Sequence, residues 1–295
     1  MNKYVIITPA HNEAAFIEKT IQSMISQTVL PERWVVVNDG SADQTGEIVK
    51  RYTSQYEFIR LVNLARDPER NFARKAIAFD RGLKEIQDLN FDFIGNVDAD
   101  MSFEPDYFEN ILREFEADPK LGIGGGIVYT KFTDNFATYD TTLDSVGGKV
   151  QLFRRKCFED IGGYRPLRYG GIDATAEIMA RMKGWRVRKS LSNKTFEHRP
   201  TGFAYGNAVT AMRCEGRRFH SLGYDPVFFV LRCIYRLRDY PYVIGSAAAL
   251  FGYFWSKICG QPIVLPADVV SFLRMEQRAK LKNLFRFRPT EHQLQ

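Results

Sequence analysis

The chain has 295 residues, a formal net charge of +6 and an apolar content of 45%. This length allows one large or two modest domains, and an apolar content in the normal range for packed cores excludes a disordered chain. The four cysteines lie far apart without a Cys-x-x-Cys pair, which argues against a zinc knuckle and against a disulfide framework. We therefore expect them to be reduced packing residues.

The positive charge is concentrated at the C-terminal end. Residues 206–295 contain 13 Lys and Arg against 6 Asp and Glu, a balance of +7, whereas residues 1–205 contain 28 against 29, a balance of −1. Such asymmetry predicts an acidic partner for the C-terminal region, either a nucleic acid or an anionic membrane surface. At the other end, Met1 is followed almost at once by an apolar segment too short for a signal peptide, so we expect a cytoplasmic protein.

Apolar runs alternate with amphipathic stretches through the first 115 residues. They predict strands at 4–8, 34–37, 58–63 and 91–97, separated by helical stretches that include 72–86 and 105–115. The later pattern is less regular, with strands expected at 121–129, 147–154 and 185–189 and helices at 157–164 and 174–183. Strands that alternate with helices predict an α/β fold with a parallel sheet and right-handed crossovers.

The segment Phe91–Asp100 ends in two carboxylates, Asp98 and Asp100. A buried strand cannot hold ionised carboxylates along its length, so these acids belong at the end where the strand emerges. In an open α/β sheet that end faces the ligand crevice, where two carboxylates suit a hard divalent cation that keeps water and substrate phosphate as its other ligands. The alternative is structural: a turn and an N-cap for the helix that begins at Pro105.

Polar clusters follow three of the predicted strands: PAHNE after the first, NDGSADQT after the second and DAD after the fourth. Because the carboxyl ends of parallel strands meet at one edge of the sheet, these clusters are expected to converge on one site. There Asp39 can accept hydrogen bonds from a nucleobase and Glu13 can bind a ribose hydroxyl. Asp98 and Asp100 would face a metal ion that neutralises a diphosphate.

In this order, six motifs within residues 3–200 resemble those of inverting family 2 glycosyltransferases with the GT-A fold, of the bacterial surface-polysaccharide type. They are PAHNE, NDGSADQT, RKAIAFDRGL, NVDAD, FRRKCFEDIGGY and GGIDATAE. The resemblance implies a Rossmann-like, mostly parallel sheet flanked by helices, with a catalytic domain at residues 1–205. Residues 206–295 would form a C-terminal α-helical extension.

The resemblance also assigns roles to single residues. The nucleotide-sugar donor would be held by Pro9, Glu13, Asp39, Lys75 and Asp98. Pro9, Glu13 and Asp39 would hold the nucleoside, Lys75 would lie near the base or a phosphate, and Asp98 would lie near the ribose. Asp100 would be the ligand of a Mg²⁺ or Mn²⁺ cofactor.

The catalytic base implied by the resemblance is Asp173 in GGIDATAE. An Asp at a helix N-terminus is ionised at neutral pH and can take a proton from an acceptor hydroxyl that attacks the anomeric carbon. Ile172 stands where the family usually has a Glu, so one carboxylate of the family pattern is missing. Glu177 is the nearest rival for the role of base. The structural alternative is that Asp173 caps its helix.

His198 follows the last predicted strand and could complete the metal site, as a histidine does in some relatives; the alternative is a hydrogen-bonded structural residue. The adjacent residues Arg199, Pro200, Thr201 and Gly202 resemble a mobile loop able to close on a diphosphate. Lysines and arginines between residues 66 and 75 could do similar work, although we expect most of them to be solvated.

The C-terminal region interleaves arginines with aromatic and aliphatic residues. Its longest uncharged run, residues 240–256, has 17 residues and contains Pro241, Gly245 and Gly252, so it is not expected to span a membrane. The pattern fits a helix in the headgroup region of an anionic leaflet, which predicts a peripheral protein on the cytoplasmic face of the membrane. A helical bundle packed on the catalytic domain and an oligomer interface are the alternatives. A nucleic-acid partner is disfavoured by the long apolar stretches.

The predicted function is transfer of one sugar from a nucleotide-diphosphate sugar to an acceptor hydroxyl, in polysaccharide or glycolipid biosynthesis. The acceptor would be a saccharide or a lipid-linked intermediate, which would explain the basic, apolar C-terminal region. No QxxRW signature of processive synthases is present, so single addition is expected. The alternatives are a polyprenyl-phosphate glycosyltransferase and a non-catalytic protein that binds sugar nucleotides. The sequence leaves the oligomeric state unknown.

Overall fold

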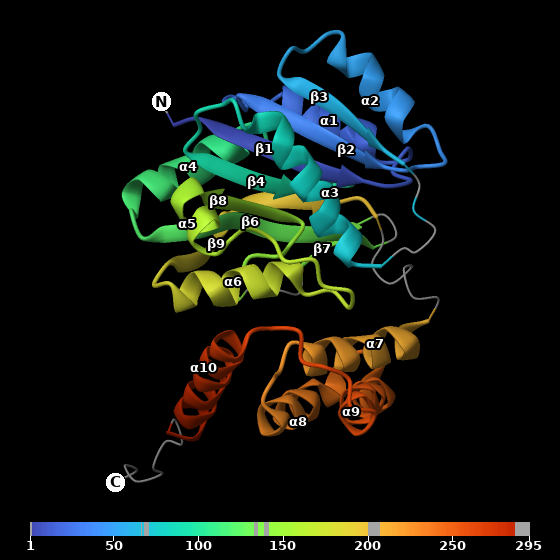
Figure 1. The fold of residues 1–295 in the computed structure, drawn as a ribbon, viewed down its shortest axis with the longest axis vertical. Helices are drawn as coiled ribbons and strands as arrows, with labels where there is room; N and C mark the ends of the chain where they lie inside the picture. Colours follow the sequence, from blue (N-terminus) through green and yellow to red (C-terminus); the bar gives the residue numbers. More distant parts are fainter. Residues whose placement is uncertain are drawn as a thin grey trace. The chain divides into compact units, whose positions relative to one another are not determined.

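The computed structural model describes residues 2–65, 67, 71–132, 135–138, 142–199 and 207–286. The chain forms two compact units, Met1–Thr201 and Gly202–Gln295. The first is an α/β unit and the second, in its described part, is helical (Figure 1). Each unit is described by itself.

The first unit starts with four parallel strands in the spatial order β3-β2-β1-β4 (Figure 1). The strands are β1 (Tyr4–Ala10), β2 (Arg33–Asp39), β3 (Ile59–Leu64) and β4 (Phe93–Val97). The connections contain α1 (Ile17–Ile25), α2 (Thr45–Thr53) and α3 (Ala73–Leu83), the last followed by a 3-10 turn η1 (Lys84–Ile86). The alternation of apolar runs and amphipathic stretches therefore predicted this half of the sheet correctly.

Beyond β4 the sheet is mixed, so its second half departs from the mostly parallel arrangement expected. Its strands are β5 (Met101–Phe103), β6 (Leu121–Phe132), β7 (Asn135–Ala137), β8 (Val150–Arg154) and β9 (Arg186–Glu197). β8 runs antiparallel to both β4 and β6. β5 is antiparallel to β9, and β7 is antiparallel to β6. Only the pair of β6 and β9 in this half is parallel among the described strands. Hydrophobic periodicity locates strands but carries no information on their direction, which explains the difference.

Three further helices belong to the first unit: α4 (Tyr107–Ala117), α5 (Arg155–Asp160) and α6 (Ile172–Met182). The N-cap position of α4 is Asp106, and β5 lies between Asp100 and this helix. Asp98 and Asp100 therefore do not cap α4, so the N-cap part of that structural alternative is wrong, whereas Asp100 does lie in a turn directly after β4. Gly184 follows α6 with a φ of +83°, a left-handed conformation suited to glycine, and the chain returns from there into β9.

The core of the first unit explains why the acids lie where they do. All five residues of β4 are buried, and Phe93 packs on Phe115 with the ring centroids 4.8 Å apart. Tyr4 stacks on Phe108 at 5.0 Å, and the buried indole N–H of Trp34 donates to the hydroxyl of Thr8 at 2.9 Å. Because β1, β2 and β4 are buried along most of their length, ionised side chains are accommodated at their ends.

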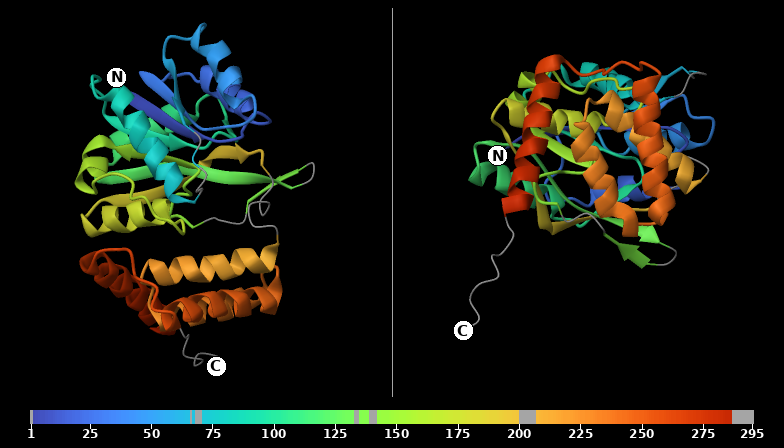
Figure 2. Two further views of the ribbon diagram at one scale, coloured as in Figure 1. Left: turned by 45° about the vertical axis from the view of Figure 1, so that its right-hand side comes forward. Right: turned by 90° about the horizontal axis from the view of Figure 1, so that it is seen from below.

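The described part of the second unit contains the helices α7 (Ala208–Ser221), α8 (Pro226–Tyr235), α9 (Tyr242–Ile258) and α10 (Ala267–Arg286), with a 3-10 turn η3 (Arg236–Arg238) after α8. α7 and α9 lie side by side (Figure 2). A Cβ atom at Gly252 would overlap the backbone of Arg213, so this glycine permits their close approach. Phe229 and Tyr253 stack beside this contact at 4.7 Å.

Two sequence expectations concern properties of the whole chain. All four cysteines are free, and Cys157 and Cys233 are buried as expected of packing residues, whereas Cys259 is exposed, so that expectation is wrong for it. Among the helices of the described residues, none combines the length and the apolar character that a membrane crossing requires.

Candidate active site

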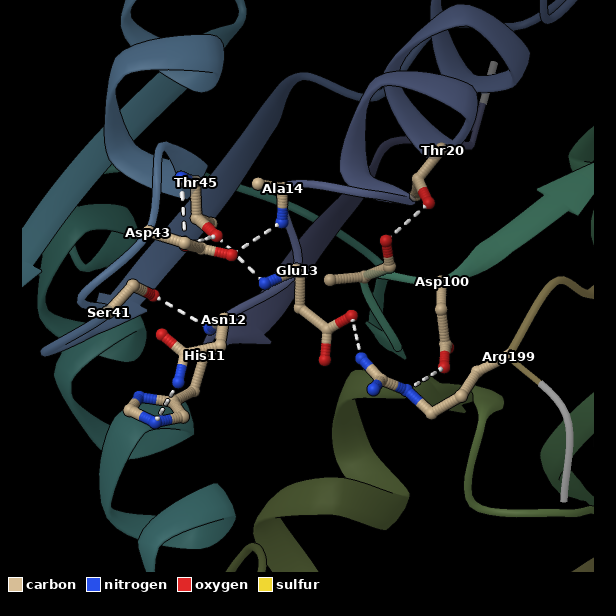
Figure 3. Close-up of polar contacts among 11 residues, drawn as sticks. His11, Asn12, Glu13, Ala14, Thr20, Ser41, Asp43, Thr45, Asp100 and Arg199 are labelled. Carbon is tan, nitrogen blue, oxygen red and sulfur yellow. Dashed lines mark hydrogen bonds and ion pairs between the residues drawn. The ribbon is translucent and has the colours of Figure 1, made fainter. Parts of the chain in front are cut away.

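The loops after β1 and β2 are joined to each other by hydrogen bonds. The carboxylate of Asp43 accepts from the backbone N–H groups of Thr45 and Ala14, both at 3.0 Å. The backbone N–H of Glu13 donates to the Thr45 hydroxyl at 2.8 Å. In Figure 3 the Glu13 side chain extends from this loop toward Arg199.

Glu13 and Asp100 converge on one arginine, Arg199. The guanidinium Nε of Arg199 donates to Asp100 Oδ2 at 3.2 Å, and a terminal nitrogen donates to Glu13 Oε2 (Figure 3). Burial and then the charge of Asp100 raise the pKa of Glu13 to about 7. Burial, followed by the charges of Asp98 and Glu197, raises the pKa of Asp100 to about 6 against the opposing effect of Arg199. The carboxylates are thus close enough to disfavour each other's charge.

Asp98 takes part in a second set of contacts. The Lys75 ammonium donates to Asp98 Oδ1 at 2.5 Å and to the carbonyl of Gly148 at 2.9 Å. The amide of Asn96 also reaches the Gly148 carbonyl, at 2.8 Å, and the Gly148 N–H donates to Asp173 Oδ2 at 3.1 Å. Gly148 therefore connects the predicted donor residues Lys75 and Asp98 with the predicted base.

Asp173 and its rival Glu177 have different environments. Asp173 lies in the first turn of α6 and is partly exposed, whereas Glu177 lies one turn later and is buried. Both Glu177 oxygens already accept hydrogen bonds, one from the Ser145 hydroxyl at 2.9 Å and one from the Val146 N–H at 2.7 Å. Burial raises the pKa of Glu177 to about 7. These contacts suit Glu177 for holding the 145–148 segment, and they leave Asp173 as the more accessible carboxylate.

Ile172 is buried at the start of α6. Its aliphatic side chain therefore belongs to the packing of the helix, at the position where the family pattern has a carboxylate.

Asp39, at the end of β2, is buried and paired with Arg74 through both carboxylate oxygens. Arg74 also contacts Asp67 at 2.9 Å, and its side chain is 14% exposed. The expectation that the basic residues of the 66–75 segment are mostly solvated is therefore wrong for Arg74. The ring of His11 donates to the Asp39 carbonyl at 2.7 Å and so links the first two loops here as well. Pro9 lies within β1, opposite Val37 of β2.

His198 is not directed at the acids in this structure. Its Nε2 is hydrogen-bonded to the hydroxyl of Ser102 at 2.8 Å, and its ring packs edge-on against Phe136 at 5.6 Å. Burial and then nearby lysines lower its pKa. The contact with Asp100 is made by the next residue, Arg199. Of the loop expected to close on a diphosphate, Pro200, Thr201 and Gly202 lie outside the described residues.

Two parts of this site were not predicted from the sequence. Glu197, at the end of β9, pairs with Lys149, accepts from the Thr130 hydroxyl at 2.6 Å and raises the pKa of Asp100. Gly148 makes the central contacts between Lys75 and Asp173. No local pattern marks either residue, because each acts through partners that are distant in sequence.

The acids fit a divalent cation of the hard, oxygen-preferring class. Within the described part of the chain, no three His, Cys, Asp or Glu side chains gather into a group that would enclose a metal ion. Asp100 would hold a cation that takes most of its other ligands from water and substrate phosphate, which is the usual coordination of Mg²⁺ in phosphate-binding sites. The side chain of Glu13 contacts a terminal nitrogen of the same Arg199 guanidinium (Figure 3).

Two solved glycosyltransferase structures share this fold. Mannosyltransferase PcManGT from Pyrobaculum calidifontis, in complex with GDP-Man and Mn²⁺, aligns with a TM-score of 0.57 and 17% identity over 96% of this chain and 82% of its own. S. aureus TarS in complex with UDP-GlcNAc aligns with a TM-score of 0.55 and 13% identity over 92% and 78%. At these identities the likeness establishes the GT-A fold.

Curated relatives are also glycosyltransferases. The probable glycosyltransferase YdaM of Bacillus subtilis is 35% identical over 253 residues, which are 78% of this chain and 59% of YdaM. Chondroitin synthase of Pasteurella multocida is 29% identical over 51% of this chain and 14% of its own length. Poly-beta-1,6-N-acetyl-D-glucosamine synthase of Staphylococcus aureus is 23% identical over 60% and 45%. The chain thus spans less than two thirds of each of these relatives.

The family model of glycosyl transferase family 2 matches residues 5–176. This range contains β1 to β4, the loops that carry Glu13, Asp39 and Asp100, and the start of α6 with Asp173. The match covers more than half of the chain and coincides with the segments that build the site. The chain belongs to glycosyl transferase family 2.

Proposed function

We propose that the chain is an inverting, metal-dependent glycosyltransferase that moves a single sugar from a nucleotide-diphosphate sugar to an acceptor hydroxyl. The observation that supports the proposal most is the convergence of acids from separated segments. Glu13 follows β1 and Asp100 follows β4, and both contact Arg199. Asp98 and Asp173 are connected through Lys75 and Gly148.

In the proposed reaction, Asp173 accepts the proton of the acceptor hydroxyl. The hydroxyl oxygen forms a bond to the anomeric carbon from the face opposite the leaving group. The bond from that carbon to the diphosphate oxygen breaks, and the nucleoside diphosphate leaves with the electron pair. A Mg²⁺ or Mn²⁺ ion on Asp100 would supply positive charge for the departing diphosphate. The Gly148 N–H orients Asp173 by its hydrogen bond to Oδ2.

The donor is proposed to lie across the carboxyl ends of β1, β2 and β4. Pro9, Glu13 and Asp39 would hold the nucleoside, with Lys75 and Asp98 near the ribose and phosphates. Two structural neighbours were solved with GDP-Man and UDP-GlcNAc, which supports a nucleotide sugar as the class of donor. Relatives named as polysaccharide synthases support a saccharide or lipid-linked acceptor.

The donor class can be tested by thermal unfolding of the full chain with UDP-, GDP- and dTDP-sugars, with and without MnCl₂. We expect one nucleotide to stabilise the chain only with Mn²⁺, by about 2.7 kcal/mol at 100 times its dissociation constant. Asp100→Asn should abolish the part of this stabilisation that depends on Mn²⁺. Asp106→Asn, at the N-cap position of α4, is the control that changes a carboxylate beyond β5. The proposal fails if no sugar nucleotide stabilises the chain in a Mn²⁺-dependent manner.

We also propose that the second unit contacts the cytoplasmic face of an anionic membrane, where a lipid-linked acceptor would be present. α9 carries a row of four large apolar side chains that are 53–77% exposed: Ile244, Phe251, Trp255 and Ile258. Their spacing of seven, four and three residues places them on one helix face. Arg213 and Arg217 of the neighbouring α7 line the hollows beside this row. Exposed apolar side chains flanked by arginines fit a helix lying in the headgroup region.

A further inference from the structure

Arg199 joins two carboxylates that lie far apart in the sequence. It contacts Asp100, 99 residues away, through Nε at 3.2 Å, and Glu13, 186 residues away, through a terminal nitrogen. Its guanidinium carbon also lies 5.0 Å from the centre of the Phe16 ring. Figure 3 shows both carboxylates at the guanidinium, Glu13 at a terminal nitrogen and Asp100 at Nε. Arg199 therefore supplies the positive charge shared by Asp100, the proposed metal ligand, and Glu13.

The contact with Asp100 occupies one of the two carboxylate oxygens that could bind a metal ion. Arg199 Nε donates to Asp100 Oδ2, and the charges of Asp98 and Glu197 act on the same carboxyl group. A carboxylate held by a guanidinium has fewer lone pairs for a second cation, and two cations at one carboxylate repel each other. Arg199 and a divalent cation are therefore competitors for Asp100.

The Arg199 side chain is less confined than the other arginine of the site. It is 40% exposed, against 14% for Arg74, which is held by Asp39 and Asp67. The backbone before it is fixed, because the N–H of His198 donates to the Asp100 carbonyl at 2.9 Å. A fixed backbone and a half-exposed side chain allow the guanidinium to change partners by rotation about its own χ angles.

We propose that Arg199 is exchanged between two partners: the Glu13 and Asp100 carboxylates in the free enzyme and the donor diphosphate once a divalent cation occupies Asp100. The inference rests on the proposed function. A guanidinium binds phosphate oxygens through two parallel N–H groups, so it keeps charge-assisted hydrogen bonds after the exchange. The exchange makes the cation bind weakly alone and more tightly with a diphosphate, because the diphosphate provides the released arginine with a new partner.

The test titrates MnCl₂ into the full chain without nucleotide, with free Mn²⁺ measured by electron paramagnetic resonance. We expect Arg199→Gln to bind Mn²⁺ about fivefold more tightly than the wild type, the scale of a partly exposed ion pair. Pyrophosphate, titrated at saturating Mn²⁺, should bind Arg199→Gln about fivefold more weakly. Arg186→Gln is the matched control, because Arg186 also pairs with an aspartate, Asp118, outside the site.

The results distinguish failure of this inference from failure of the proposed function. Equal or weaker Mn²⁺ binding by Arg199→Gln overturns the inference. If Asp100→Asn binds Mn²⁺ as the wild type does, the metal site of the proposed function fails instead. If Arg199→Gln does not fold, Arg199→Lys replaces it, because lysine keeps the positive charge but lacks the planar guanidinium. The inference then requires that Arg199→Lys binds pyrophosphate more weakly than the wild type. Circular dichroism of every variant separates loss of folding from loss of binding.

Discussion

Asp173 combines an accessible carboxylate with a fixed orientation, since the Gly148 N–H donates to one of its oxygens. We predict that Asp173→Asn lowers transfer to a hydroxyl acceptor by about 10²–10⁴-fold, because the amide cannot take up the proton. The variant should bind the donor as the wild type does, which is measured by the thermal stabilisation that the donor gives in the presence of Mn²⁺. Asp160→Asn on α5 is the control, since this aspartate pairs with Lys156 and Trp185 outside the site.

The same variant separates the alternative functions. Activity that survives Asp173→Asn would indicate an acceptor that is already ionised, such as a polyprenyl phosphate. A wild-type chain that binds a nucleotide sugar with metal and transfers it to no acceptor would indicate a non-catalytic binding protein.

Glu177 gives the stability of the first unit a pH dependence of predictable sign. Its pKa is raised by burial from 4.5 to about 7, so between these values the folded chain holds a proton that the unfolded chain has released. The stabilising contribution is complete below pH 4.5 and is lost as the pH rises through 7. Relative to the wild type, Glu177→Gln should therefore gain stability from pH 5 to pH 8, with a slope of at most about 1.4 kcal/mol per pH unit.

Urea unfolding of both proteins at pH 5, 6.5 and 8 measures this difference. Glutamine keeps an acceptor oxygen for the Val146 N–H, so the variant retains one of the contacts to the 145–148 segment. Glu57→Gln changes an exposed residue after α2 and is the control. The difference between its free energy of unfolding and that of the wild type should be the same at all three pH values. A pH-independent difference for Glu177→Gln would contradict the assigned environment.

At the scale of elements, the 145–148 segment and the start of α6 depend on each other. A Cβ at Gly148 would lie 2.6 Å from Oδ2 and Cβ of Asp173, closer than real Cβ contacts, so Asp173 would have to move. Gly147→Ala is the matched control, since its Cβ would meet one atom within 4 Å, Val128 Cγ2 at 3.9 Å. We predict that Gly148→Ala lowers kcat by about 10²-fold, the cost of about 1 Å of misplacement.

The measurement compares kcat and the far-UV circular dichroism of both glycine variants. We expect Gly147→Ala to retain the wild-type rate and both variants to stay folded. Equal rates for Gly148→Ala and the wild type would show that the position of Asp173 does not limit transfer.

The elements differ in how well local sequence predicted them. β1 to β4 were located because each is an apolar run between polar turns, and β1, β2 and β4 are also largely buried. β5 and β7 have three residues each, too few for a periodic signal. β9 continues to Glu197, eight residues beyond the expected end, because the later residues pair with β6 and β5 although most of their side chains are polar. Pairing between distant strands decided these elements.

At the scale of the whole molecule, the exposed row on α9 predicts membrane binding by the full chain. We expect co-sedimentation with vesicles of phosphatidylcholine and phosphatidylglycerol, with little binding to phosphatidylcholine alone and weakening at high salt. Removing two large apolar side chains by Phe251→Ser and Trp255→Ser should weaken binding more than tenfold, since each contributes about 1.5–3 kcal/mol when buried.

The matched control for this experiment removes two exposed leucines of the first unit, Leu30→Ser and Leu191→Ser. Light scattering measures the molar mass of each variant and so tests the alternative that a second copy of the chain covers the row. Equal partitioning of the wild type and the α9 double variant would exclude this row as the membrane contact. If the α9 double variant has a lower molar mass in solution than the wild type, the row belongs to an oligomer interface.

The sequence alone determined the chemistry available to this protein. Apolar runs located four strands, and the cost of burying free charge placed acids at the ends of three of them. The ordered motifs then gave the fold and the family, which the comparisons confirmed.

Only the tertiary structure decided which side chains act on each other. It paired Asp39 with Arg74, turned the His198 ring toward Ser102, and connected Lys75 with Asp173 through Gly148. The physical reason is distance along the chain. Periodicity reports the environment of a residue within its own helix or strand, whereas ion pairs and hydrogen bonds between loops depend on where separate segments meet.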